Sequence, residues 1–303
     1  MAKKNNNLTI IIVTYLTNRD ILLNCLKSIS RDFKVIIVEN SKKFADTNFF
    51  KKKFKNLEIV CSGKNLGYGK GNNYGLVKTK TDYALILNPD TVLEKNFFSN
   101  IKKIITKKNF SIIGCSYTND KIFMPAGFFD SKKNDSFRKN FFKKKQKKFT
   151  KVDWVVGCAM LLNLNKFEKR NIFDKNIFLY FEEFDLCKSI LKKKGSIFLS
   201  SELKVHHLGF KSSFSTNDKL RNEANKIKDW HWMWSYFYFY KKNYNYFYAF
   251  YKIFGKMIKS LLKSIFYTVI FSEKNRDKYL FRFMGLFSSV IGRESNYRGK
   301  KFY

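Results

Sequence analysis

The 303-residue chain is long enough for one catalytic domain with an appendage, and its 45% hydrophobic content excludes a wholly disordered protein. Its 60 basic and 24 acidic residues give a formal net charge of +36, which predicts an anionic partner, either nucleic acid or a phospholipid surface. Five widely spaced cysteines without a C-x-x-C pair argue against a disulfide framework and a zinc site, and favour a reducing compartment.

The N-terminal part of the chain alternates predicted strands and helices. Runs of β-branched and aliphatic residues indicate strands at positions 8–13, 33–38, 57–61 and 83–87, and apolar residues at helical spacing follow the first of them over positions 19–28. This alternation predicts an α/β fold with a doubly wound, mostly parallel central sheet and helices on both faces.

Polar residues follow three of these strands, namely Thr14, Glu39 and Asp90. Asn88-Pro89 ends the fourth strand because proline cannot donate to a ladder, so Asp90 comes at the carboxyl end of a core strand, where open α/β sheets bind ligands. A carboxylate there suits a hard divalent cation, and such a cation suits a diphosphate. The alternative is a carboxylate that serves only as a turn residue or as a cap for a helix from about residue 94.

A segment rich in glycine and asparagine spans residues 65–75. Its glycines have the spacing G-x-G-x-G, which differs from the G-x-G-x-x-G of a dinucleotide fingerprint. We expect them to let backbone N–H groups at a helix start approach an anionic or sugar ligand, and a plain flexible turn is the alternative.

The middle of the chain continues the pattern with a predicted helix over residues 96–107 and a strand over 110–115. The lysine-rich stretch at residues 131–151 predicts an exposed, mobile loop inserted into the domain. Residues 152–163 predict a buried strand that is entered through a Gly157-Cys158-Ala159 turn, whose small residues would let a substrate approach the backbone.

Three acids, Glu182, Glu183 and Asp185, stand at the start of a predicted helix. These acids either complement the helix dipole or include a general base. We favour a general base, because Tyr180 and Phe181 make the approach to these acids apolar. Further on, His206 and His207 lie in an extended segment, where adjacent side chains point to opposite sides, so at most one faces a site.

The composition shifts towards aromatic residues from about position 217. Four lysines at helical spacing within residues 251–271 leave an apolar face, which predicts a helix that lies in a membrane interface rather than one that spans it. That apolar face comprises Ile253, Phe254, Met257, Ile258, Leu261, Leu262 and Ile265. The alternative is a helix that packs on the catalytic domain through the same face. We therefore divide the chain into a catalytic domain, 1–215, and a helical, membrane-associating region, 216–303.

These motifs, in this order, resemble the inverting family 2 glycosyltransferases of the GT-A fold, and within them the rhamnosyltransferase-like branch. The resemblance covers about residues 8–213. It is carried by residues 10–15, 38–41, 65–72, 87–90, 157–159, 178–187 and 207–209. The family usually has Asp at the positions of Glu39 and Glu183, and an acid at that of Asn88.

The resemblance implies a metal-dependent, inverting transfer from a nucleoside-diphosphate sugar. Asp90 and His207 would hold Mg²⁺ or Mn²⁺, and Glu183 would be the catalytic base, with Glu182 as the alternative. The implied donor-binding residues are Thr14, Tyr15, Glu39, Asn65, Gly67, Gly69, Gly71, Asn72, Asn88 and Asp90. The implied acceptor-binding residues are Trp154, Gly157, Cys158 and Asp185.

The donor that the resemblance favours most is dTDP-rhamnose, and a UDP-sugar is the second choice. The implied acceptor is a polyprenyl-diphosphate-linked glycan in cell-surface polysaccharide synthesis. We expect the protein to bind the anionic surface of the inner membrane peripherally, at its cytoplasmic face, and to bind no nucleic acid. A basic nucleic-acid-binding protein is an alternative that explains the charge but gives no role to Asp90 or Glu183. A family member that has lost activity is another.

Overall fold

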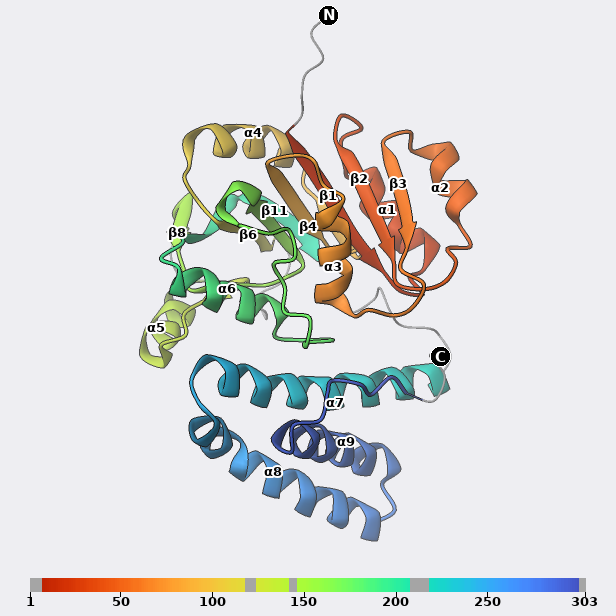
Figure 1. The fold of residues 1–303 in the computed structure, drawn as a ribbon, viewed down its shortest axis with the longest axis vertical. Helices are drawn as coiled ribbons and strands as arrows, with labels where there is room; N and C mark the ends of the chain where they lie inside the picture. Colours follow the sequence, from red (N-terminus) through yellow and green to blue (C-terminus); the bar gives the residue numbers. More distant parts are fainter. Residues whose placement is uncertain (1–6, 118–123, 142–145, 208–217, 300–303) are drawn as a thin grey trace, which may run out of the picture. The chain divides into compact units, whose positions relative to one another are not determined.

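In a computed structural model of the protein, residues 7–117, 124–141, 146–207 and 218–299 are described. The chain divides into two compact units, and each contains segments that are distant in sequence (Figure 1). The sheet unit comprises Met1–Leu66, Lys70–Phe173 and Leu186–Ser213. The helical unit comprises Gly67–Gly69, Asp174–Asp185 and Phe214–Tyr303. The expected boundary at residues 215–216 lies outside the described residues.

Four parallel strands form the first half of the central sheet. They are β1 (Leu8–Thr14), β2 (Lys34–Glu39), β3 (Leu57–Cys61) and β4 (Tyr83–Leu87), in the spatial order β3-β2-β1-β4. Their buried β-branched residues explain this arrangement, because parallel strands are covered on both faces. The predicted α/β fold is confirmed.

The second half of the sheet is mixed rather than mostly parallel. β10 (Ala159–Asn163) runs antiparallel to both β4 and β6 (Ile112–Tyr117), and β11 (Ile197–His207) is parallel to β6. β11 also pairs antiparallel with β5 (Thr91–Leu93) and with β8 (Phe149–Lys151). The strand direction escaped prediction because a fully buried strand has the same apolar run in either direction.

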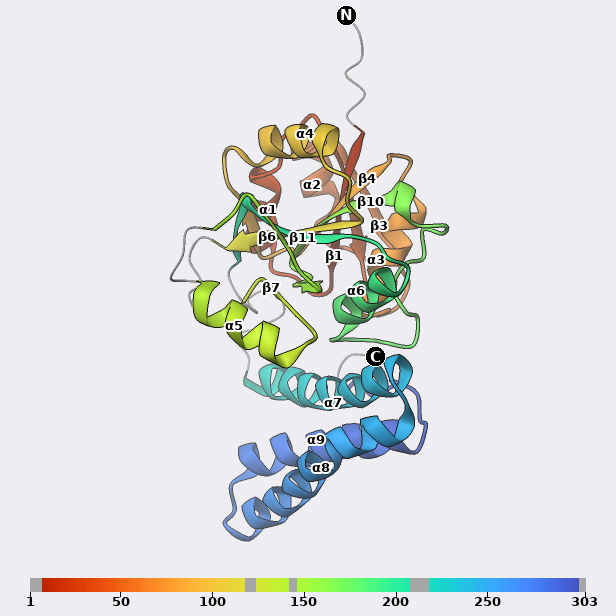
Figure 2. The ribbon, with the colours of Figure 1, turned by 90° about the vertical axis from the view of Figure 1, so that its left-hand side faces the viewer.

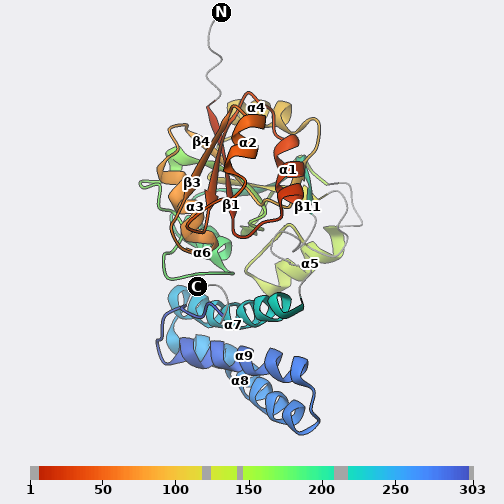
Figure 3. The ribbon, with the colours of Figure 1, turned by 90° about the vertical axis from the view of Figure 1, so that its right-hand side faces the viewer.

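Helices cover both faces of the sheet (Figure 3). Apolar residues of α1 (Arg19–Lys27), α2 (Thr47–Lys53) and α4 (Phe97–Lys107) share one core with alternate residues of the strands. α3 (Tyr68–Val77) covers the other face, where a side chain at Gly75 would lie 2.6 Å from Ile11 Cγ2 of β1. The helices predicted at residues 19–28 and 96–107 are therefore confirmed as α1 and α4.

The lysine-rich stretch at 131–151 is not a simple loop, and that prediction is wrong. Residues Ser131–Phe141 form α5, and β8 follows; residues 142–145 lie outside the described residues. The Phe137 ring contacts Phe128 at 5.5 Å and Phe141 at 5.3 Å between centroids. Asp130 caps the helix start, because its Oδ1 accepts a 2.8 Å hydrogen bond from the N–H of Lys133. An aromatic pair at i,i+4 and a cap stabilise this helix despite its charge.

A two-stranded ribbon and one short helix complete the sheet unit. β7 (Ala126–Gly127) pairs antiparallel with β9 (Trp154–Val155), which divides the strand predicted at 152–163 into β9 and β10. A 3₁₀ helix, Leu164–Lys166, follows β10.

The helical unit contains α7 (Asp218–Asn243), α8 (Tyr246–Val269) and α9 (Glu273–Val290), and each of the three packs on the other two (Figure 2). Their shared core includes Phe237, Ala249, Ile253 and Leu286. The helix predicted within residues 251–271 is confirmed as part of α8. Within the described ranges, every helix falls short of the length and apolar character needed to cross a membrane.

Candidate active site

The carboxyl ends of β1 and β2 bring Thr14 and Glu39 together. These strands are parallel, so their ends lie at one edge of the sheet, and Thr14 Oγ1 donates a 2.6 Å hydrogen bond to Glu39 Oε2. Burial raises the pKa of Glu39, while hydrogen bonds from Thr14 and Ser41 oppose that rise. Tyr15 hydrogen-bonds the side chain of Asn65, so both join this group of polar residues. The four predicted donor-binding residues at these positions are thus gathered in one place.

The turn after β4 places Asn88 and Asp90 beside β10. The N–H of Asn88 donates a 2.8 Å hydrogen bond to the carbonyl of Cys158, and the N–H of Thr91 donates one of 3.2 Å to the carbonyl of Asn88. Asn88 Oδ1, Asp90 Oδ1 and Thr91 Oγ1 are buried, and none of the three receives or donates a hydrogen bond within the described structure. Buried polar oxygens without partners are rare, which marks this turn as a place for a ligand.

His207 lies next to Asp90 because β11 pairs with β5. In that register His207 is opposite Thr91 and His206 is opposite Val92, so the two histidines point to different sides. His207 Nε2 is 3.4 Å from Asp90 Oδ1. Tyr117, which sequence reasoning missed, stacks on the His207 ring at 6.1 Å between centroids.

Asp90 and His207 fit a divalent cation as two of its ligands. A carboxylate oxygen without a hydrogen bond and an imidazole nitrogen are both suitable donors, and a diphosphate and water would complete the coordination. Across the described residues there is no group of three His, Cys, Asp or Glu side chains that would hold a metal alone. A cation here would therefore depend on its substrate for ligands.

The glycines of residues 65–75 have a packing role that the sequence did not reveal. A Cβ at Gly71 would lie 2.8 Å from Val13 Cγ1, and one at Gly75 would lie 2.6 Å from Ile11 Cγ2, so both let α3 approach β1. Gly67 has a φ of +81°, and a Cβ there would lie 2.1 Å from the carbonyl oxygen of Phe178. Gly69 lies in the first turn of α3, and Asn72 is buried in the same helix.

The predicted acceptor-binding residues of the sheet unit lie around β9 and β10. Trp154 is half-buried in β9, and its ring would contact a side chain at Gly127. Gly157 and Cys158 precede β10; the Cys158 side chain is buried, and its Sγ lies 3.1 Å from the Tyr117 hydroxyl.

Glu182 and Glu183 begin α6 (Glu182–Lys192) in the helical unit. The two residues before them, Tyr180 and Phe181, have φ values of 68° and 70°, a conformation that non-glycine residues adopt at a cost. Glu182 is buried, and its Oε1 has no hydrogen-bond partner in the described part of the chain. Burial, followed by the negative charge of Glu183, raises the pKa of Glu182 well above its usual value. Burial therefore favours the protonated form of Glu182.

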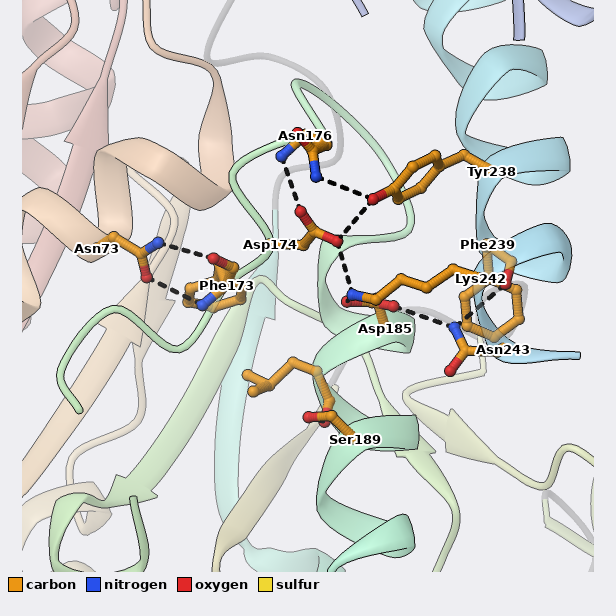
Figure 4. A network of polar contacts seen from close by, with 11 residues as sticks. Asn73, Phe173, Asp174, Asn176, Asp185, Ser189, Tyr238, Phe239, Lys242 and Asn243 are labelled. Atoms are coloured by element: carbon orange, nitrogen blue, oxygen red, sulfur yellow. Dashed lines mark hydrogen bonds and ion pairs between the residues drawn. The ribbon is translucent and has the colours of Figure 1, made fainter. Parts of the chain in front are cut away.

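Lys242 of α7 anchors the segment that carries these acids (Figure 4). Its Nζ lies 2.6 Å from Asp174 Oδ2 and 2.6 Å from Asp185 Oδ2, and Asn243 Nδ2 donates a 3.0 Å hydrogen bond to Asp185 Oδ1. Both carboxylate oxygens of Asp185 are thus engaged and the residue is buried. The structure thus gives Asp185 an anchoring contact, and its expected contact with an acceptor stays a prediction.

The sequence profile of glycosyl transferase family 2 matches residues 9–170, more than half of the chain, and includes the edge that carries Thr14, Glu39 and Asp90. The chain belongs to glycosyl transferase family 2. The predicted family is confirmed.

Two curated proteins resemble this family 2 chain. It is 27% identical over 190 residues to the low-salt glycan biosynthesis hexosyltransferase Agl10 of Haloferax volcanii, a match that covers 60% of this chain and 61% of the relative. It is 25% identical over 202 residues to the rhamnosyltransferase WbbL of Escherichia coli, covering 59% of this chain and 74% of that protein. The match thus spans about three fifths of the length of Agl10.

Solved structures confirm the GT-A fold of this family 2 chain. The mannosyltransferase PcManGT from Pyrobaculum calidifontis, solved with GDP-Man and Mn²⁺, has a TM-score of 0.52 at 9% identity, with 94% of this chain and 87% of that chain covered. GalNAc-T7, solved with UDP, GalNAc and Mn²⁺, has a TM-score of 0.51 at 12% identity, with 77% and 50% covered.

The raised pKa of Glu182 predicts how the stability of this family 2 chain depends on pH. A carboxyl group that keeps its proton only when folded loses stabilising free energy as the pH rises above the pKa of the unfolded group, about 4.3. The loss is about 1.4 kcal/mol for each pH unit until the folded pKa is passed. We expect Glu182→Gln to raise the Tm relative to the wild type more at pH 8 than at pH 5. An equal difference at the two pH values would contradict a raised pKa of Glu182 in the folded protein.

Proposed function

We propose that the chain is an inverting, metal-dependent glycosyltransferase that moves a sugar from a nucleoside-diphosphate sugar to a hydroxyl group of a glycan acceptor. Membership of family 2 supports the reaction class. The observation that carries the proposal is the turn after β4, beside His207. There Asn88, Asp90 and Thr91 present buried oxygens that have no hydrogen bond from any described residue. Such a turn suits the cation and the diphosphate of a donor.

Residues of the sheet unit would bind the donor. Asp90 and His207 would hold Mg²⁺ or Mn²⁺, and the ion, when bound, would stabilise the charge that develops on the leaving diphosphate. Thr14 already holds the Glu39 carboxylate in place, so Glu39 can accept hydrogen bonds from the nucleoside without first being ordered. Tyr15 and Asn65 lie beside it and would complete the nucleoside contacts.

Glu183 would be the base. It would take the proton of the acceptor hydroxyl while that oxygen attacks the anomeric carbon, and the bond to the diphosphate would break with its electron pair leaving on the nucleoside diphosphate. Attack from the face opposite the leaving group inverts the anomeric configuration. Burial raises the pKa of Glu182 and so favours its protonated form, which cannot accept the acceptor's proton, and this supports Glu183 as the base.

The names of two relatives support the proposed class of donor. The names of WbbL, a rhamnosyltransferase, and of Agl10, a hexosyltransferase of low-salt glycan biosynthesis, support a deoxyhexose or hexose donor. We propose dTDP-rhamnose first and a UDP-sugar second. The proposed acceptor is a polyprenyl-diphosphate-linked glycan, reached from the cytoplasmic face of the inner membrane, in cell-surface polysaccharide synthesis.

A thermal-shift screen of nucleotide sugars tests the donor site. We expect dTDP-rhamnose or a UDP-sugar to raise the Tm in the presence of Mn²⁺ or Mg²⁺, because a ligand at 100 times its Kd stabilises the folded protein by about 2.7 kcal/mol. Asp90→Asn should keep the Tm of the free protein and lose the metal-dependent part of the shift. Single-stranded DNA is the control.

Three outcomes would count against the proposal. Stabilisation by the DNA and by none of the nucleotide sugars would support a nucleic-acid-binding protein instead. A metal-dependent Tm shift in Asp90→Asn equal to that of the wild type would show that the cation binds at another site. Donor binding without transfer to any acceptor or to water would indicate a family member that has lost activity.

A further inference from the structure

α8 of the helical unit has three different faces. One face is buried against α7 and α9 through Ala249, Ile253, Ser260 and Ser264. The small residues on this face let the helices approach closely, and Ile253 joins the shared core with Phe237. The apolar face predicted from the sequence is therefore divided. Ile253 and Met257 pack inward, whereas four other members of that face are exposed: Phe254, Ile258, Leu262 and Ile265.

A second face of α8 exposes a continuous row of large apolar side chains, which we call the α8 stripe. Its members recur every three or four residues and so share one side of the helix: Phe247, Tyr251, Phe254, Ile258, Leu262, Ile265 and Val269. Their exposed fractions run from 40% at Ile258 to 84% at Phe247, and Phe271, just beyond the helix, is 91% exposed. Scattered exposed apolar residues are ordinary, but a row along a helix about 36 Å long marks an interaction surface.

The third face of α8 carries a row of four lysines, Lys252, Lys256, Lys259 and Lys263, between the stripe and the buried face. The contacts that the structure gives them are with tyrosines: Lys252 lies over Tyr248, Lys256 over Tyr236, and Lys263 over Tyr279. These contacts leave the lysines charged: no carboxylate of the described residues forms an ion pair with them, and α8 contains no acidic residue. The row therefore presents a local positive charge along one side of the apolar surface.

We propose that the α8 stripe inserts into the interface of an anionic lipid bilayer, with the helix parallel to the membrane plane and the lysine row at the level of the headgroups. An apolar face beside a basic row is the pattern of interfacial helices, and phosphate headgroups complement the lysines. A second copy of the chain fits less well, because pairing the stripes would bring together two lysine rows on chains that each carry a net charge of +36.

This inference rests on the proposed function and deepens it. The α8 stripe would hold the enzyme at the membrane, where a lipid-linked acceptor is found. Its test does not depend on donor or transfer. Binding of the full-length protein to vesicles is measured by co-sedimentation without nucleotide sugar, and nucleotide-sugar binding is measured separately. A protein that does not bind vesicles would therefore contradict the membrane surface alone, and one that does not bind nucleotide sugars would contradict the donor site alone.

The deciding comparison uses two matched double variants. Phe254→Gln with Leu262→Gln alters the stripe at positions that are 51% and 60% exposed. Phe49→Gln with Val77→Gln alters the sheet unit at positions that are 39% and 58% exposed. On vesicles of phosphatidylglycerol and phosphatidylethanolamine we expect the first to lower the partition coefficient by roughly 100-fold and the second to leave it unchanged. Unaltered circular dichroism and nucleotide-sugar binding would show that both variants fold.

A third variant tests the role of the headgroups. Replacing the four lysines of α8 with glutamine should weaken binding to the anionic vesicles by roughly 5-fold per lysine and leave binding to phosphatidylcholine vesicles little changed. Three results would overturn the proposal: equal losses in the two matched variants, no loss in either, or a wild-type dimer that the stripe variant dissociates while neither binds vesicles. The last result would assign the stripe to contact between copies.

Discussion

Glu183→Gln is expected to lower kcat for sugar transfer by roughly 100-fold to 10,000-fold, the usual contribution of a general base. Glutamine has nearly the same shape but cannot accept the proton of the acceptor hydroxyl, so the KM for the donor should hardly change. The measurement is the steady-state rate of nucleoside diphosphate release with the lipid-linked acceptor present. Donor binding, followed by thermal shift, shows that the variant is folded.

Glu182→Gln is the matched control for this loss. It changes the adjacent carboxyl in the same way, but the raised pKa of Glu182 favours its protonated form, so its substitution should cost far less activity. If Glu182→Gln abolished transfer while Glu183→Gln retained it, the roles of the two residues would be reversed. A wild-type rate in both variants would show that neither glutamate is the catalytic base.

Lys242→Met is expected to produce the second large effect, although Lys242 would touch no substrate. Its Nζ lies 2.6 Å from both Asp174 and Asp185, whose side chains are only 9% and 5% exposed, so its loss leaves two buried carboxylates without their countercharge. We expect a loss of about 1–3 kcal/mol in the free energy of unfolding, moderated because Lys242 is itself 38% exposed.

Activity separates a positioning role from a merely structural one. At a temperature where Lys242→Met is folded, kcat should fall roughly 10-fold or more while the KM for the donor stays the same, since a small displacement of a catalytic group can cost that much. Lys242→Arg should restore much of the rate, and Lys241→Met, at the neighbouring exposed position, should match the wild type. An unchanged kcat in a destabilised Lys242→Met would show that Lys242 stabilises the fold only.

Much of the sheet unit was predictable because its signals are local. Continuous apolar runs identify β1 to β4, and apolar residues at helical spacing identify α1 and α4. The meeting of Thr14 with Glu39 also follows from sequence, because parallel neighbouring strands end at one edge.

Features that depend on distant pairing were not predictable. His207 reaches Asp90 only through the register of β11 on β5, and no local pattern determines that register. Lys242 binds Asp185 across 57 positions of sequence, and no local pattern indicates that ion pair. The many lysines of α5 favoured a loop, although the Phe137–Phe141 pair stabilises a helix there. The glycines of α3 suggested a ligand site, but they also allow close packing on β1.

The interleaving of the two units has a consequence for how such proteins diversify. Residues 174–185, including both glutamates, belong with the C-terminal helices, and Phe181 contacts Trp232, Tyr236 and Phe239 of α7. A hybrid that joined the first 215 residues of this chain to the tail of a relative would therefore replace the surroundings of the proposed base, Glu183. Recombination should succeed only where that segment and the tail are exchanged together, so we expect the two to be inherited as a pair.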